Sequence, residues 1–157
     1  MTDVIIHDNL ALMIEGKGMN WADVLYYEGK TFVVEWYFTE GGDMPGLEHY
    51  KAMDEITQER LDYMIMYIAD SPAGTLLPST MYKVEDAENR IYAFKPRDER
   101  FFNFMTTGKK IIITNAYRKH SMKMARKDRR IASKAGEYRA DYLKRTKEGS
   151  YYEAIKG

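Results

Sequence analysis

The chain has 157 residues, of which 45% are hydrophobic and 31% are charged, a composition typical of one folded domain. It contains no cysteine, which excludes disulfides, thiolate metal sites and cysteine nucleophiles. No apolar run reaches the roughly 18–20 residues that span a bilayer, and the N-terminal residues lack the features of a signal peptide. We therefore expect a cytoplasmic protein with no membrane partner.

The formal net charge of zero conceals an asymmetry along the chain. Residues 1–89 hold 17 acidic and 5 basic residues, a net charge of −12, whereas residues 90–157 hold 19 basic and 7 acidic residues, a net charge of +12. Within the second half, residues 117–147 alone carry 12 basic and 3 acidic residues. Such a segment is typical of a surface that binds nucleic acid or another acidic partner, and the alternative is a basic helix that is only solvated.

The first half of the chain predicts one strand followed by a pair of helices. Residues 1–30 carry no clear pattern, and we treat them as an N-terminal extension of unclear role. In residues 30–40 apolar side chains occupy both faces of an alternating pattern, which predicts a strand covered on both sides. Pro45 suits the first turn of a helix and Thr57 could cap a second helix, so residues 46–70 predict a helical pair.

The second half predicts an antiparallel meander and a final helix. An irregular strand is expected within the connection that precedes the meander, at residues 76–86. Aromatic and β-branched residues then dominate three runs, which suits strands at residues 90–95, 100–105 and 110–117. The breaks between the runs are long enough only for hairpin turns. An apolar stripe with helical spacing predicts a helix over residues 125–147, followed by a flexible tail at residues 148–157.

Two hairpins in series bring the turn after the first meander strand and the exit of the third to the same end of the sheet. Both segments are basic, so seven side chains are expected to converge there: Lys95, Arg97, Arg100, Arg118, Lys119, His120 and Lys123. A cluster of cations with one histidine is what a phosphate-rich ligand requires.

Two segments carry a resemblance to a known family. Residues 32–45, FVVEWYFTEGGDMP, combine a strand with an acidic, glycine- and proline-containing start of the helices, and residues 117–142, YRKHSMKMARKDRRIASKAGEYRADY, combine an aromatic residue, basic residues, a hydroxyl and a late Asp-Tyr pair. With the order strand, helical pair, meander and C-terminal helix, they resemble the RelE/HigB/ParE toxin superfamily, most closely its phage-derived HigB-like branch. Ala125 stands where that branch has a proline, and His120 where it has a second lysine. The resemblance implies an α+β, RelE-like domain over residues 31–147.

Toxins of this superfamily cleave mRNA, usually on the ribosome, and the resemblance implies the same metal-independent reaction without a cofactor. A ribose 2′-OH attacks the adjacent 3′-phosphate, which requires a base, cations and an acid. The implied catalytic residues are Arg100 as a phosphate clamp, Lys119 and Lys95 as added charge or base, and His120 as acid or base. The implied RNA-binding residues are Arg97 as a second phosphate clamp, Arg118, Lys123, Arg126, Lys127 and Tyr117, whose ring could stack on a base. The implied partners are mRNA, the ribosome and a cognate antitoxin, often a helix-turn-helix protein.

Several of these residues have an alternative interpretation. Arg100 could pair with Asp98 or Glu99 in its turn, which would make it a structural residue. His120 could be an ordinary surface histidine, and Tyr117 could belong to the core because aromatic residues at strand ends usually pack.

The function also has alternatives. One is a binder on the same fold without nuclease activity, either a gyrase-directed toxin as in the ParE branch or an inactive phage-derived protein. Another is a plain nucleic-acid-binding domain, whose affinity for a duplex would fall steeply with salt. The three histidines lack a paired spacing, so no metal site is expected.

Overall fold

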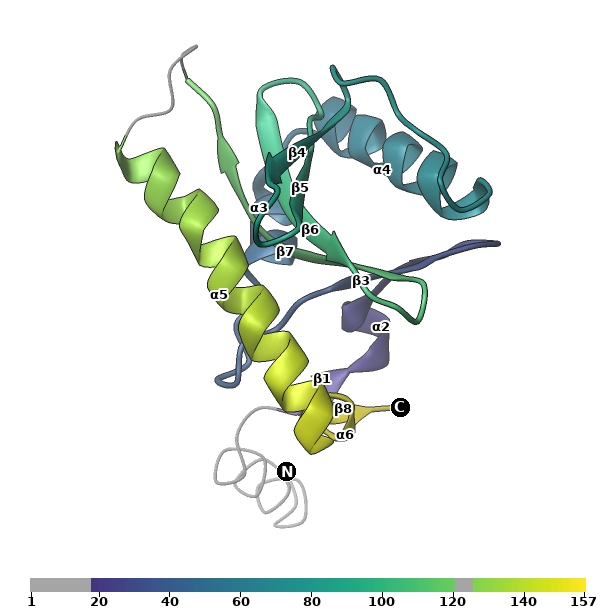
Figure 1. The fold of residues 1–157 in the computed structure, drawn as a ribbon, viewed down its shortest axis with the longest axis vertical. Coiled ribbons are helices and arrows are strands. Elements are labelled where there is room, and N and C mark those ends of the chain that lie inside the picture. The colour runs from purple at the N-terminus through teal and green to yellow at the C-terminus, as the bar shows by residue number, and fades with distance from the viewer. Residues whose placement is uncertain (1–17, 121–125) are drawn as a thin grey trace, which may run out of the picture.

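The computed structural model describes residues 18–120 and 126–157, which form a mixed α+β arrangement (Figure 1). In chain order the elements are β1 (Met19–Asn20), α2 (Trp21–Val24), β2 (Leu25–Glu28), β3 (Val33–Trp36), α3 (Pro45–Ala52), α4 (Glu55–Asp70), β4 (Tyr82–Asp86), β5 (Ile91–Phe94), β6 (Glu99–Met105), β7 (Lys110–Arg118), α5 (Arg126–Glu148), α6 (Ser150–Glu153) and β8 (Ile155–Lys156).

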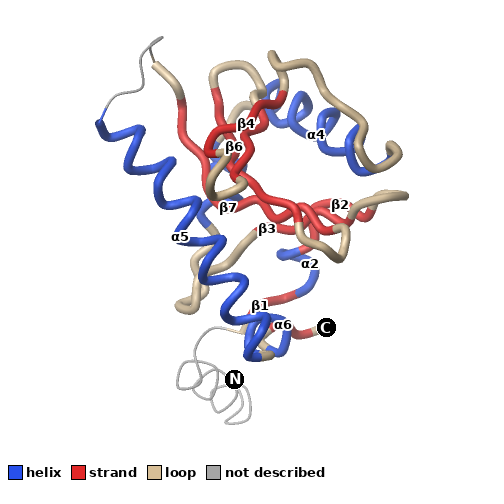
Figure 2. Tube along the Cα trace, in the orientation of Figure 1, coloured by secondary structure: helices blue, strands red, loops and turns tan. Residues whose placement is uncertain are grey.

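Six strands form one sheet in the order β2-β3-β7-β6-β5-β4 (Figure 2). β3 and β7 run parallel, and the other neighbouring pairs run antiparallel. The predicted meander is confirmed as β5, β6 and β7, and β4 precedes it where an irregular strand was expected. The predicted order of strand, helical pair, meander and C-terminal helix is also confirmed.

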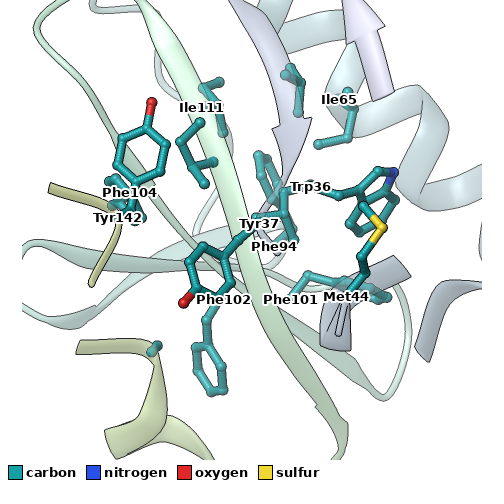
Figure 3. Close-up of a cluster of buried hydrophobic side chains, with 14 of the residues drawn as sticks. Trp36, Tyr37, Met44, Ile65, Phe94, Phe101, Phe102, Phe104, Ile111 and Tyr142 are labelled. Atoms are coloured by element: carbon teal, nitrogen blue, oxygen red, sulfur yellow. The ribbon is translucent and has the colours of Figure 1, made fainter. Parts of the chain in front are cut away.

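Helices cover both faces of the sheet. On the helical-pair face, α3 packs against β7 and α4 packs against β2 and β3, whereas on the α5 face α5 packs against β7 and β6. Trp36 contacts Tyr50 of α3, and its neighbour Tyr37 contacts Tyr138 of α5. Figure 3 shows Trp36 and Phe104 on opposite sides of the central strand. Trp36 and Tyr37 are 3% and 1% exposed, so the predicted two-sided cover of this strand is confirmed.

The helical pair begins where the sequence places turn and capping chemistry. Pro45 occupies the first turn of α3, where its missing N–H costs no hydrogen bond. α4 is capped by Asp54, whose Oδ1 accepts a hydrogen bond from the backbone N–H of Thr57 at 2.7 Å. The prediction that Thr57 itself caps this helix is therefore wrong, because the carboxylate three residues earlier satisfies the free N–H groups of the first turn.

The predicted apolar stripe of α5 faces the sheet. Ala135 and Tyr142 are buried, and Ile131 and Tyr138 are half-buried against the same core. The stripe continues to Arg145, which is only 5% exposed. A long basic helix therefore also contributes a buried charge, which its apolar spacing did not predict.

Both ends of the described chain take part in the fold, which differs from the expectation for residues 1–30 and 148–157. β2 forms one edge of the large sheet, and β1 pairs in parallel with β8. Tyr151 of α6 is fully buried, stacked on Phe38 and edge-on to Tyr142. A terminal position suggested fraying, but burial of this aromatic side chain offsets the cost of ordering the segment.

In the two described ranges, the search for a helix long and apolar enough to cross a bilayer finds none.

Candidate nucleic-acid interface

The β5–β6 turn and the exit of β7 lie at the same end of the sheet. Glu99 at the start of β6 pairs with Arg118 at the end of β7. One step further, the backbone N–H of Lys119 donates to the carbonyl oxygen of Asp98 at 2.7 Å. The predicted convergence of these two backbone segments is therefore confirmed.

A β-bulge decides which face each of these side chains occupies. Between Ile113 and Ala116, β7 has one residue more than the facing segment of β6. A bulge of this kind reverses the alternation of side chains along the strand. Tyr117 consequently stacks on Phe102 on the α5 face, with ring centroids 5.7 Å apart, and Arg118 lies on the helical-pair face.

Three basic side chains on the α5 face, Lys83, Arg100 and Lys119, lie within electrostatic reach of Lys95. We call these four residues the cationic cluster. Burial lowers the pKa of Lys95, and the charges of Arg100, Lys83 and Lys119 lower it further. The ammonium group of Lys95 donates to the carbonyl oxygen of Ser79 at 2.9 Å. Because these cations repel one another, the cluster favours an anionic ligand that would neutralise them.

Arg100 is held in place by the backbone of its own turn. Its Nη1 donates to the carbonyl oxygens of Arg97 and Glu99, at 2.9 and 2.8 Å. These are its hydrogen bonds within the described residues, so the remaining guanidinium N–H groups have no protein acceptor there. The alternative that Arg100 pairs with the carboxylate of Asp98 or Glu99 is not what the structure shows. A guanidinium fixed on one side and open on the other is suited to binding phosphate oxygens.

Tyr117 lies next to the cationic cluster, within reach of the charge of Arg100, and belongs to the hydrophobic core. It is 5% exposed, which agrees with the alternative that this ring packs rather than stacks on a base. Burial raises its pKa, the charges of Glu85 and Asp128 raise it further, and Arg100 lowers it. Asp128 lies in the first turn of α5, so the start of the basic helix adjoins the same region (Figure 1).

Two of the predicted RNA-binding residues are engaged elsewhere. Arg118 contacts the carboxylate of Glu99 at 3.0 Å and that of Asp98 at 3.9 Å. Arg97 lies 4.0 Å from the carboxylate of Asp54, at the start of α4. The expected single cluster of seven side chains is therefore divided between two faces of the sheet. The division has a physical reason. The bulge in β7 turns Arg118 toward Glu99, and Asp54, from the acidic first half of the chain, lies beside Arg97.

The remaining candidates surround the α5 face. His120 follows Lys119 directly and is exposed, and Lys123 lies outside the described residues. Arg126 and Lys127 are exposed at the start of α5. The structure therefore places Lys95, Arg100 and Lys119 together, with His120 adjacent in the chain and two further cations at the neighbouring helix.

Two residues of this site were missed by the sequence interpretation. Lys83 and Glu85 project from the edge strand β4 and form an ion pair of 3.2 Å, with the Glu85 side chain only 11% exposed. Glu85 brings a carboxylate close to Lys95 and Tyr117. Their alternate spacing in a strand was the available signal, but it did not reveal which strand β4 would join.

His49 has a partner that sequence spacing could not reveal. Its Nε2 lies 2.6 Å from Oε1 of Glu99 although the residues are 50 positions apart. Because Glu99 also binds Arg118, His49 belongs to the ion-pair network of the helical-pair face. No group of three or more metal-ligating side chains gathers among the described residues.

The chain matches no protein-family model, and no curated protein matches it. The cationic cluster and the fold that positions it are thus the basis for a functional conclusion.

Proposed function

We propose that this protein is a toxin of a type II toxin–antitoxin system, a metal-independent endoribonuclease that cleaves mRNA on the ribosome. The observation that carries the proposal is the cationic cluster, in which Arg100 keeps an open guanidinium edge beside the partly desolvated Lys95. The order of strand, helical pair, meander and C-terminal helix supports a RelE-like fold. The cognate antitoxin, a helix-turn-helix protein, would neutralise the toxin by covering this cluster.

The proposed reaction divides among residues that the fold brings together. Arg100 binds the scissile phosphate and stabilises the negative charge that develops on it. Burial and cationic neighbours lower the pKa of Lys95, so a larger fraction of its amine is unprotonated, and able to accept a proton, than for a solvated lysine. Lys119 adds charge, and Glu85 offers a carboxylate as an alternative base.

The bonds and protons balance without a further reactant. The ribose 2′-oxygen forms a bond to phosphorus as its proton passes to Lys95 or Glu85, and the bond from phosphorus to the 5′-oxygen breaks. The leaving 5′-oxygen takes a proton from His120. The products are a 2′,3′-cyclic phosphate and a 5′-hydroxyl end.

Inducible expression followed by mapping of the 5′ ends of cellular mRNA tests this proposal. The wild-type protein is expected to arrest growth and to create new 5′-hydroxyl ends, whereas Arg100→Ala is expected to leave growth and transcripts intact while remaining folded. Arg60→Ala is a matched control, since Arg60 is exposed on α4, outside the cationic cluster. Intact mRNA at a level of wild-type protein that arrests growth would contradict the nuclease.

A binder without nuclease activity is favoured by a separate observation. α5 exposes basic side chains over its first three turns, on an element that contains none of the catalytic candidates: Arg126, Lys127, Arg129, Arg130 and Lys134. A gyrase-directed toxin would use such a surface. Inhibition of DNA supercoiling by the wild-type protein, lost on replacing Arg126 and Lys127 with alanine and retained in Arg100→Ala, would identify this second function.

A further inference from the structure

A cavity of about 480 Å³ lies on the helical-pair side of the molecule, where α2 and β2 meet α3 and α4. Its walls are mainly aromatic and apolar, and they include Tyr26, Trp36, Leu47, Tyr50, Asp62 and Met66. These residues are defined as the aromatic pocket. The cavity is separate from the cationic cluster, with which it shares no residue.

Three rings make up the aromatic wall. Tyr26 stacks on Trp36 with centroids 4.6 Å apart and planes 10° from parallel. Tyr50 lies edge-on to Tyr26 at 5.6 Å and tilted to Trp36 at 5.5 Å. The faces of such rings carry partial negative charge and attract cations within about 6 Å.

One carboxylate is fixed at this wall by two phenols. The hydroxyls of Tyr26 and Tyr50 both donate to Oδ1 of Asp62, at 2.5 and 2.8 Å. Burial, followed by the hydrogen bond to Asp62, raises the pKa of Tyr50 to about 12 and raises that of Tyr26 further, so both phenols keep their protons. Both bonds end on Oδ1, and Oδ2 accepts no hydrogen bond from a described residue.

Both an acidic and a basic side chain lie at the opening of the cavity. Asp23 lines the cavity and is exposed, and Lys51 is an exposed cation on the same rim. A phosphate would meet two carboxylates and the rings of Tyr26 and Tyr50, which disfavours it. A cation would meet ring faces and an open carboxylate oxygen at the same place.

α4 continues from the pocket as an exposed apolar surface. Met66 lines the cavity and is 47% exposed, and the nearby Tyr63 and Tyr67 are 61% and 44% exposed. The acidic residues of this helix outnumber its basic ones, with Glu55, Glu59, Asp62 and Asp70 against Arg60. An apolar surface with acidic borders complements a polypeptide that carries both apolar and basic side chains.

We propose that the aromatic pocket binds an arginine side chain of a protein partner, whose neighbouring apolar residues lie along α4. The planar guanidinium stacks on the ring of Tyr26 or Tyr50 and donates to Oδ2 of Asp62. Arginine fits this arrangement better than lysine because one planar group can stack and form a directed hydrogen bond at the same time. The inference is independent of the nuclease, since it uses a different face and an oppositely charged ligand.

Titration monitored by the two tryptophan indole signals in ¹H–¹⁵N spectra tests the pocket directly. The probe is N-acetyl-arginine methylamide, and its control is the citrulline analogue, which has the same shape without charge. The signal of Trp36 is expected to shift with the arginine probe, while that of Trp21, which does not line the cavity, stays in place. Asp62→Asn is expected to weaken binding about tenfold, equivalent to about 1.4 kcal/mol, and Asp23→Asn is expected to weaken it less.

Two controls keep the result interpretable. Glu88→Gln removes an exposed carboxylate from the turn after β4 and is expected to leave the affinity unchanged. Asp23 is exposed, so Asp23→Asn tests the charge of the rim even where loss of the Asp62 carboxylate unfolds the protein. The proposed site would be overturned if the citrulline probe bound as tightly as the arginine probe, or if the arginine probe left the indole signal of Trp36 unchanged.

A second titration, with a peptide, tests whether the ligand is a polypeptide. A peptide with one arginine between leucines is expected to bind more tightly than the free probe. Tyr63→Ser, which removes an exposed ring of α4 outside the cavity lining, is expected to reduce that gain while the free probe binds as before. A peptide no tighter than the probe would overturn the protein partner and leave a site for small cations.

Discussion

The α5 face carries basic side chains in two regions that differ in how their charges are satisfied. At one end of the sheet, Lys95, Arg100 and Lys119 form no ion pair with a described carboxylate, although Glu85, which pairs with Lys83, lies close enough to act on Lys95. At the start of β7 and along the last turns of α5, Lys110 pairs with the fully buried Glu35 at 2.8 Å, and Arg145 pairs with Asp141 at 2.7 Å. We call the second region the C-terminal lock.

The C-terminal lock joins distant parts of the chain through these ion pairs. The hydroxyl of Tyr152 donates to Glu35 at 2.8 Å, and the ammonium of Lys110 lies 4.0 Å from the centre of the Tyr152 ring. Arg145 also donates to the carbonyl oxygen of Phe38. The difference teaches that basic residues on one face of the sheet have two roles. Those paired with a buried or half-buried carboxylate hold the fold, whereas those without an ion pair are available to a ligand.

The largest expected effect is on the lock. Tyr151→Ala removes a fully buried ring from between Phe38 and Tyr142 and is expected to lower the free energy of unfolding by about 3–5 kcal/mol. Urea denaturation measures the change. Tyr63→Ala, which removes a ring that is 61% exposed, is the control and is expected to change stability by less than about 1 kcal/mol. Equal effects of the two variants would mean that the C-terminal segment does not stabilise the domain.

Removing the cation that pairs with the buried Glu35 has the next largest expected effect. Lys110→Met leaves the carboxylate of Glu35 buried without its cation and is expected to cost about 3 kcal/mol. Lys144→Met, on the exposed side of α5, is the control. The double variant Glu35→Leu with Lys110→Met is expected to recover much of the loss, since no buried charge remains. No recovery would show that packing, rather than charge, dominates at this position.

The smallest expected effect sharpens the account of the cationic cluster. Burial and three cations lower the pKa of Lys95 from 10.5, so the folded protein releases this proton at a lower pH than the unfolded chain. As pH rises through that window, wild-type stability is expected to improve relative to Lys95→Met, by no more than about 1 kcal/mol, while affinity for RNA falls. Paired urea denaturation and RNA titrations from pH 7 to 10 measure both trends. A stability difference that declines with rising pH would contradict the lowered pKa.

Local patterns predicted most of the elements but not the site in detail. Turn chemistry and short apolar runs were enough for the meander, and helical spacing was enough for α5. The bulge between Ile113 and Ala116 could not be predicted, because it arises from the register of β7 against β6. It moves Arg118 to the other face, where Glu99 binds it.

Long-range contacts account for the other differences. Glu35 and Tyr152 meet across 117 positions, and no local pattern marks either residue as a buried partner. The same holds for Asp62, which accepts a hydrogen bond from the hydroxyl of Tyr26, 36 positions away in the chain. Sequence spacing predicts which residues share an element, whereas these pairs depend on how the elements pack.

The central claim is that unpartnered cations on the α5 face bind the nucleic acid, whereas paired ones do not. Equilibrium binding of a single-stranded RNA oligonucleotide over a range of salt concentrations, with wild type, Arg100→Ala and Arg118→Ala, tests it most directly. Arg100→Ala is expected to weaken binding and to reduce the slope of log affinity against log salt by about 0.7, the value for one lost phosphate contact, whereas Arg118→Ala is expected to change neither. Loss of slope in Arg118→Ala with a wild-type slope in Arg100→Ala would contradict the account.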